Sequence, residues 1–183
     1  MADNSRGPFF RRAVPPDREA FLRYVETRRA ALAEVRAKGV GGMALIEAAG
    51  ELGSALFMEP GCEAEAAVLL EEALALSRKR GDRATEIDGL LGLATARQYL
   101  GERDAAMAMF EEGLRQCAQT GIREQENFLL HHMGRCLVEM GRIAEAKAAF
   151  EKALVLRQAI GNPRFIASTE GALEELAKLN IYK

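Results

Sequence analysis

GCEAEAAVLLEEALALSRKRG, at residues 61–81, is the stretch that decides the fold, because its pattern returns twice along the chain. Residues 101–121 read GERDAAMAMFEEGLRQCAQTG, and residues 141–161 read GRIAEAKAAFEKALVLRQAIG. Each stretch begins and ends with glycine, and each follows the previous one by 40 residues. A fixed period of this length is typical of repeat architectures, so the sequence predicts an array of similar units.

The positions that repeat are those expected of paired helices. Equivalent positions at the 40-residue step carry Ala66, Ala106 and Ala146; Leu70, Phe110 and Phe150; Glu71, Glu111 and Glu151; and Leu74, Leu114 and Leu154. The segments between successive glycines have 19 residues, are rich in Ala, Leu, Glu and Arg, and contain no proline. Apolar residues recur there at three and four positions, so each segment is predicted to be one helix. Glycine just past a helix end supplies a left-handed turn, and the predicted unit is therefore a helical hairpin.

Length, composition and cysteine content narrow the class of protein. The chain has 183 residues, of which 49% are apolar, so one domain with a sizeable core is expected. No apolar run is long enough to cross a bilayer, which argues against a membrane protein. Cys62, Cys117 and Cys136 are odd in number and share no CxxC spacing, so reduced thiols and a cytoplasmic location are expected.

Charge is distributed unevenly. The net charge is −2, which argues against nucleic acid as a partner, because binding to phosphates needs a basic field. Residues 1–42 nevertheless carry a net charge of +4 and residues 43–183 a net charge of −6. We therefore expect a flexible basic head at residues 1–16, followed by a single domain at residues 17–183.

The hairpins resemble the tetratricopeptide repeat family, in a variant with a 40-residue period. In the unit that begins at Ile87, the first-helix positions of the family pattern hold Leu90, Leu93 and Ala94, and the second-helix positions hold Ala106 and Phe110. The next unit repeats them as Leu130, Met133, Gly134, Ala146 and Phe150. The Tyr of the family pattern is replaced by Arg97 and Leu137, and its helix-ending Pro by Ala118 and Gln158, so the second helices run on to the next glycine.

The expected fold is all-α: a right-handed superhelical solenoid of antiparallel helix hairpins, with about three repeats and flanking helices. We expect a helix at 17–38, repeats at about 43–80, 84–120 and 124–160, and a C-terminal capping helix at 164–179. The first repeat places Gly50, Gly53 and Ser54 at first-helix positions, which predicts a looser helix there.

The resemblance implies that the first helices of the hairpins line a concave groove that binds a peptide or protein. The residues that would face this groove are Met58, Asp88, Leu91, Thr95, Gln98, Phe128, His131, Arg135 and Val138, together with Ala48, Glu51 and Ala55 of the first repeat. Apolar members would contact a partner, and Arg135 and His131 would donate hydrogen bonds to a carboxylate.

The sequence therefore favours a non-catalytic scaffold that binds a protein or peptide, with no cofactor. His132 and Cys136 form one i, i+4 pair, but a structural metal site needs four ligands and no nucleophile motif is present, so we expect neither a metal site nor an enzyme. The alternatives are a self-associating structural protein, a secretion-type chaperone and, with less support, a peptide-sensing regulator. Phe9–Arg12 could dock in the groove of its own chain or in that of a second copy, as a homodimer.

Overall fold

The computed structural model describes residues 9–12 and 14–180 of the chain. Within these residues the chain forms eight α-helices and no strand. They are α1 (Arg18–Ala37), α2 (Met43–Leu56), α3 (Glu63–Arg80), α4 (Arg83–Tyr99), α5 (Arg103–Thr120), α6 (Glu126–Glu139), α7 (Ile143–Ile160) and α8 (Pro163–Asn180). The prediction of an all-α fold built from helix hairpins is confirmed.

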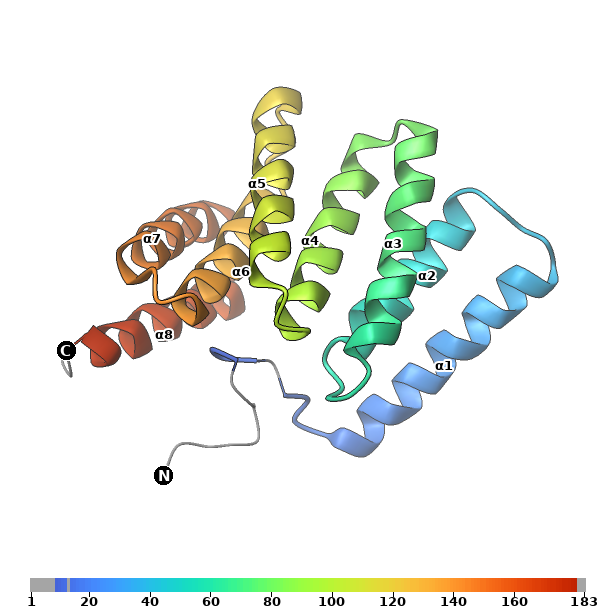
Figure 1. Ribbon diagram of the computed structural model, residues 1–183, viewed down its shortest axis with the longest axis horizontal. Coiled ribbons are helices and arrows are strands. Elements are labelled where there is room, and N and C mark those ends of the chain that lie inside the picture. The colour runs from blue at the N-terminus through green and yellow to red at the C-terminus, as the bar shows by residue number, and fades with distance from the viewer. Residues whose placement is uncertain (1–8, 13, 181–183) are drawn as a thin grey trace. The chain divides into compact units, whose positions relative to one another are not determined.

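The chain divides into two compact units. The N-terminal unit is Arg12–Met109, and the C-terminal unit is Met1–Arg11 with Phe110–Lys183, so the boundary falls within α5. In the N-terminal unit α1, α2, α3 and α4 pack in succession, and α2 also contacts α4 (Figure 1). In the C-terminal unit α6 packs on α7, and α7 packs on α8.

Glycines end the helices as the sequence predicts. The six glycines that begin and end the three repeated stretches have φ values between 70° and 92°. These values lie in the left-handed region that residues with a Cβ atom avoid. Gly81, for example, caps α3 with φ 70°, and the amide of Asp82 then donates to the carbonyl of Ser77. The side chain of Asp82 caps the next helix by accepting from the amide of Thr85 at 3.2 Å, so one Gly-Asp pair ends α3 and starts α4.

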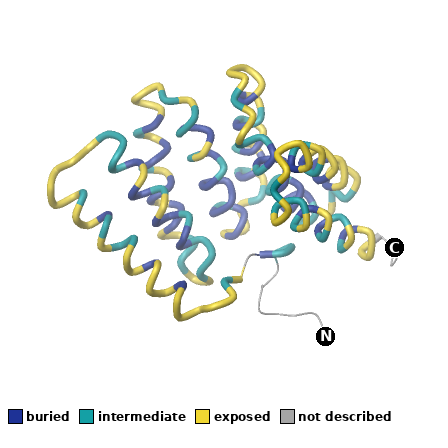
Figure 2. Tube along the Cα trace, turned by 180° about the vertical axis from the view of Figure 1, so that it is seen from behind, coloured by how far each residue is buried: buried dark blue, intermediate teal, exposed yellow. Residues whose placement is uncertain are grey.

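The core of the N-terminal unit is a continuous layer of aliphatic side chains. Leu52 and Leu56 of α2 lie against Leu70 and Leu74 of α3, and all four are buried. Helix α4 is buried without interruption from Gly92 to Ala96, whereas the buried residues of α1 and α3 form stripes beside exposed outer faces (Figure 2). These stripes have the three-and-four spacing that defines an amphipathic helix.

The core of the C-terminal unit depends on a close approach between α6 and α7. Phe150 of α7 is fully buried against Gly134 of α6, where a Cβ atom would lie only 2.8 Å from the phenyl ring. The small residue at this position of the repeat therefore lets the two helices cross closely, as the pattern predicts.

The first repeat has two glycines within its first helix. Helix α2 is continuous from Met43 to Leu56 and passes through both Gly50 and Gly53. Gly53 is required for packing, since a Cβ atom there would lie 2.7 Å from Cγ of Leu70. Gly50 has no such role, because nothing lies within 4 Å of a Cβ atom built on it.

Candidate functional site

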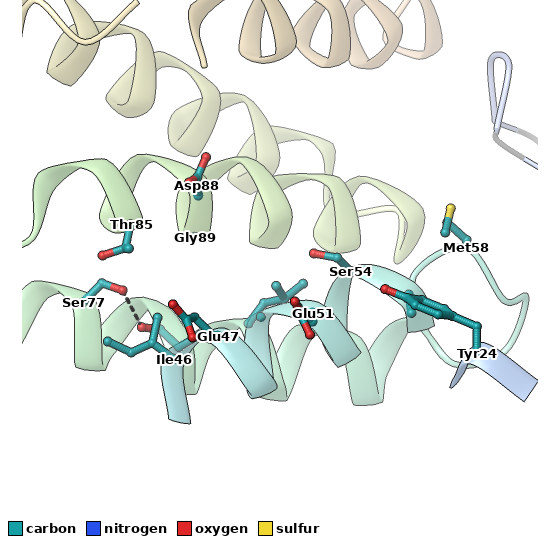
Figure 3. Close-up of a pocket in the computed structure, with 14 residues that line it drawn as sticks. Tyr24, Ile46, Glu47, Glu51, Ser54, Met58, Ser77, Thr85, Asp88 and Gly89 are labelled. Carbon is teal, nitrogen blue, oxygen red and sulfur yellow. Dashed lines mark hydrogen bonds between the residues drawn. The ribbon is translucent and has the colours of Figure 1, made fainter. Parts of the chain in front are cut away.

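A hollow of about 390 Å³ lies in the N-terminal unit, lined by residues from α1, α2, α3 and α4. Its volume falls in the range of ligand-binding clefts. Figure 3 shows Glu47 and Glu51 of α2 across from Asp88 of α4, with Tyr24 and Met58 at one end. The full lining is Tyr24, Ile46, Glu47, Gly50, Glu51, Ser54, Ala55, Met58, Leu70, Ala73, Ser77, Thr85, Asp88 and Gly89.

Small residues create this hollow. Gly50, Ser54 and Ala55 of α2 and Gly89 of α4 are all among its lining residues. Because the space beyond the Cα atom of Gly50 is empty to 4 Å, no side chain of the unit fills that region. Gly50 and Ser54, which weaken the first repeat as a sequence match, therefore shape the hollow.

The hollow combines an apolar floor with an acidic rim. Ile46 and Leu70 are buried at its base. Three carboxylates lie among its lining residues, those of Glu47, Glu51 and Asp88. Glu51 also accepts a hydrogen bond from Arg28 of α1 at 2.6 Å, which raises the pKa of that guanidinium. The arrangement suits an apolar group that carries a positive charge beside it.

The groove residues predicted in the N-terminal unit differ in their surroundings. Glu51, Ala55, Met58 and Asp88 line the hollow, and Leu91 is half-buried. Thr95 and Gln98 are buried, and the hydroxyl of Thr95 donates to the carbonyl of Leu91 at 2.8 Å. Thr95 and Gln98 are buried because α4 packs on both α2 and α3, and a helix that packs on two others has a wide buried face.

In the C-terminal unit, α8 covers part of the predicted groove. The rings of Phe128 on α6 and Phe165 on α8 meet edge to face, with centroids 5.0 Å apart. The guanidinium of Arg157 lies 5.4 Å from each ring centroid. Phe128 therefore packs on the final helix of its own chain.

Arg157 is buried among neutral acceptors. Its guanidinium donates to Asn127 Oδ1 at 3.0 Å, to the carbonyl of Phe165 at 3.0 Å and to Thr169 Oγ1 at 2.7 Å. A fourth contact, of 3.3 Å, joins Arg157 Nη1 to Nδ1 of His131. Burial lowers the pKa of Arg157 to about 10, so the group stays charged at neutral pH.

His131 is held neutral by these surroundings. A guanidinium can only donate, so Nδ1 of His131 accepts, and the ring proton is on Nε2. Burial first, and then electrostatic interaction with His132 and with the guanidiniums of Arg157, Arg135 and Arg11, lowers the pKa of His131 far below its usual value. His131 is thus a core residue that orders Arg157 and Thr169.

Arg135 and Val138 lie farther along α6, and Arg135 contacts the head of the chain. Its Nε donates to the carbonyl of Phe10 at 3.1 Å, while Val138 is half-buried. Residues 9–12, expected to be flexible, thus make defined contacts, while residues 1–8 and 13 of the predicted head lie outside the described part of the chain. The site residues that sequence reasoning missed here are Glu139, Gly171 and Glu175, which also contact the head.

Among residues 9–12 and 14–180, no three side chains of His, Cys, Asp or Glu are grouped so that they could hold a metal ion. In that part of the chain, no helix combines the length and the apolar character needed to cross a membrane.

Comparison with known structures identifies the fold of the chain. A kinesin light chain-like protein from Podosopora anserina with nearly identical TPR-like repeats superposes with a TM-score of 0.66, at 19% identity, over 90% of this chain and 81% of that one. BtubC (BKLC) from P. vanneervenii superposes with a TM-score of 0.73, at 18% identity, over 88% of this chain and 67% of that one. The chain is therefore a helical-repeat protein of the tetratricopeptide-like fold.

The family resemblance is confirmed within this class. The family model of the tetratricopeptide repeat matches residues 129–159, which cover most of α6 and most of α7. The chain thus carries a tetratricopeptide repeat at that hairpin. Among curated proteins, none is significantly similar to this sequence.

Proposed function

We propose that this chain is a non-catalytic scaffold that binds a protein or peptide, and that the hollow of the N-terminal unit is one of its binding sites. Tetratricopeptide repeats typically mediate protein interactions, which supports the general role. The observation that carries the proposal is the hollow itself. It is lined by Met58 and Asp88, two of the residues that the repeat pattern assigns to the groove.

The chemistry of the hollow defines the partner it fits. An apolar side chain would fill the space left by Gly50 and Ser54. A neighbouring Lys or Arg would face Glu47 and Asp88, which are both exposed. We therefore infer a protein partner that presents a large apolar residue beside a basic one. Among the described residues, Cys62, Cys117 and Cys136 are not joined in disulfides, which supports a reducing compartment such as the cytoplasm.

Site-specific photo-crosslinking tests this proposal. A photoreactive residue at Met58, in the full chain within its source cell, should yield a discrete crosslinked product. The matched control is the same residue at Val68 of α3, which is 65% exposed and does not line the hollow. A Gly50→Leu substitution should abolish the Met58 product, because leucine favours the helix and fills the hollow. A product that survives Gly50→Leu unchanged would show that the hollow is not the site.

A further inference from the structure

Phe10 is held on α6 by both of its main-chain polar groups. Its amide donates to Glu139 Oε1 at 3.1 Å, and its carbonyl accepts from Arg135 Nε, also at 3.1 Å. Arg135 and Glu139 are four residues apart, so they lie on one face of the helix. Hydrogen bonds to the main chain recognise a polypeptide whatever its side chains, because every residue except proline offers the same donor and acceptor.

The side chains of Phe10 and Arg11 make contacts that depend on the sequence of the bound segment. The ring of Phe10 lies 6.2 Å from the ring of Phe150, centroid to centroid. The guanidinium of Arg11 donates to Glu175 Oε2 at 3.0 Å and to the carbonyl of Gly171 at 3.2 Å. An aromatic residue followed by arginine is therefore read by one aromatic ring, one carboxylate and one helix carbonyl.

Gly171 leaves the space that Arg11 occupies. A Cβ atom on Gly171 would lie 3.1 Å from Nη2 of Arg11, closer than ordinary contact. Glycine inside a helix is otherwise unfavourable, so its presence in α8 is accounted for by the arginine that lies against it.

The bound segment is a turn with a strained backbone. Residues 9–11 form a bend and turn, and Arg11 has φ 52°, which is uncommon for a residue with a Cβ atom. Surrounding contacts must hold such a conformation, and the strain opposes the binding of this segment. A competing peptide that makes the same contacts without this strain would therefore displace the segment.

We propose that Arg135, Glu139, Phe150, Gly171 and Glu175 form a binding site for a peptide turn that carries an aromatic residue followed by arginine, and that Phe10–Arg11 is its resident occupant. The site rests on the proposed peptide-binding function but lies in the C-terminal unit, apart from the residues of the hollow. The head thereby competes with any partner that presents the same pair, as a tethered segment at high effective concentration.

Fluorescence anisotropy with a labelled peptide of residues 5–14, SRGPFFRRAV, tests the proposal on the full chain. A Phe10→Ala/Arg11→Ser variant, in which the site is vacated, should bind the peptide roughly 10-fold or more tightly than the wild type, since a short tether acts at millimolar concentration. Equal affinity for the two proteins, or no binding to the vacated variant, would overturn the proposal.

Charge reversal separates recognition from a fold defect. In the vacated variant, Glu175→Arg should lower the affinity for the peptide at least 10-fold. A peptide that carries Arg11→Glu should restore the affinity of this variant. The matched control is Glu174→Arg, the same change at the neighbouring exposed residue of α8, which should leave the affinity unchanged. Equal losses at the two positions, without recovery, would refute the assignment of Glu175.

Gly171→Leu in the vacated variant provides an independent check. Leucine should stabilise α8 and raise the melting temperature while it blocks the space of Arg11 and abolishes peptide binding. Retained binding would contradict the proposed position of Arg11 against Gly171.

A wild type that forms a dimer, when the Phe10→Ala/Arg11→Ser variant does not, would show instead that the head binds a second copy. If the vacated variant does not bind the peptide but the Met58 crosslink still forms, this site alone is refuted and the proposed function stands.

Discussion

His131 makes the stability of the protein depend on pH above the range in which carboxylates titrate. The native ring is neutral, because burial and the neighbouring positive groups lower its pKa far below the 6.5 of an exposed histidine. The unfolded chain restores that ordinary pKa. Below pH 6.5 the unfolded state therefore binds one more proton than the native state, and the free energy of unfolding falls as the pH falls.

The magnitude follows from this difference in proton binding. For a native ring that stays neutral and an unfolded ring with a pKa of 6.5, the loss between pH 7 and pH 5 is about 2 kcal/mol. Stability from His131 is thus complete above pH 6.5 and decreases steadily below it. The ion-paired carboxyls of Glu65 and Glu145, whose pKa values are lowered from 4.5, contribute mainly below this window.

A His131→Asn substitution isolates the effect. The Asn side-chain oxygen can accept from Arg157 and Thr169 as Nδ1 does, but it does not titrate. Urea unfolding followed by circular dichroism at pH 7 and pH 5 should show a pH-dependent loss smaller by about 2 kcal/mol in the variant. Burial also lowers the pKa of His132, but that residue is present in both proteins, and its contribution cancels in the comparison. An equal pH dependence in the two proteins would refute the assignment of a neutral, buried His131.

Two further predictions concern packing. Gly50→Ala should stabilise the protein by about 1 kcal/mol, because nothing lies near the new methyl group. Gly53→Ala should destabilise it by about 1–3 kcal/mol, because the new methyl group would clash with Leu70. The urea midpoints of the two variants should therefore shift in opposite directions. Arg157→Met should destabilise the protein by about 2–4 kcal/mol, because Asn127, His131 and Thr169 lose a buried donor. A urea midpoint unchanged in Arg157→Met would mean that water replaces those hydrogen bonds.

The repeat pattern predicts the hairpins because helix-ending glycines and helix-crossing residues act within one unit. Gly81 must adopt a left-handed conformation for the chain to turn after α3, whatever lies beyond its hairpin. Gly134 must leave room for Phe150 of the same hairpin, so this requirement is also local. These requirements recur every 40 residues and are visible in a single sequence. The fold class and the hairpin unit follow from them.

The groove was less predictable because its surroundings are not periodic. The repeat assigns Phe128 and His131 to an open face, but α8 follows the last hairpin as a single helix and covers both residues. Likewise the head covers Arg135, through a contact between residues 125 positions apart in the chain. No spacing rule could reveal either contact, since each joins a repeat to a segment outside the array.

Departures from the repeat identify the particular features of this chain. The position that holds Ser77 and Cys117 in the first two stretches holds Arg157 in the third, and all three residues are buried. A long cation at a site built for a small side chain needs acceptors beyond its own hairpin, and α8 supplies two of them through Phe165 and Thr169. The same logic applies to Gly50 and Ser54, where the loss of large side chains leaves the hollow. Periodic positions therefore specify the scaffold, and the positions that break the period show where the chain has acquired a docked helix or a cavity.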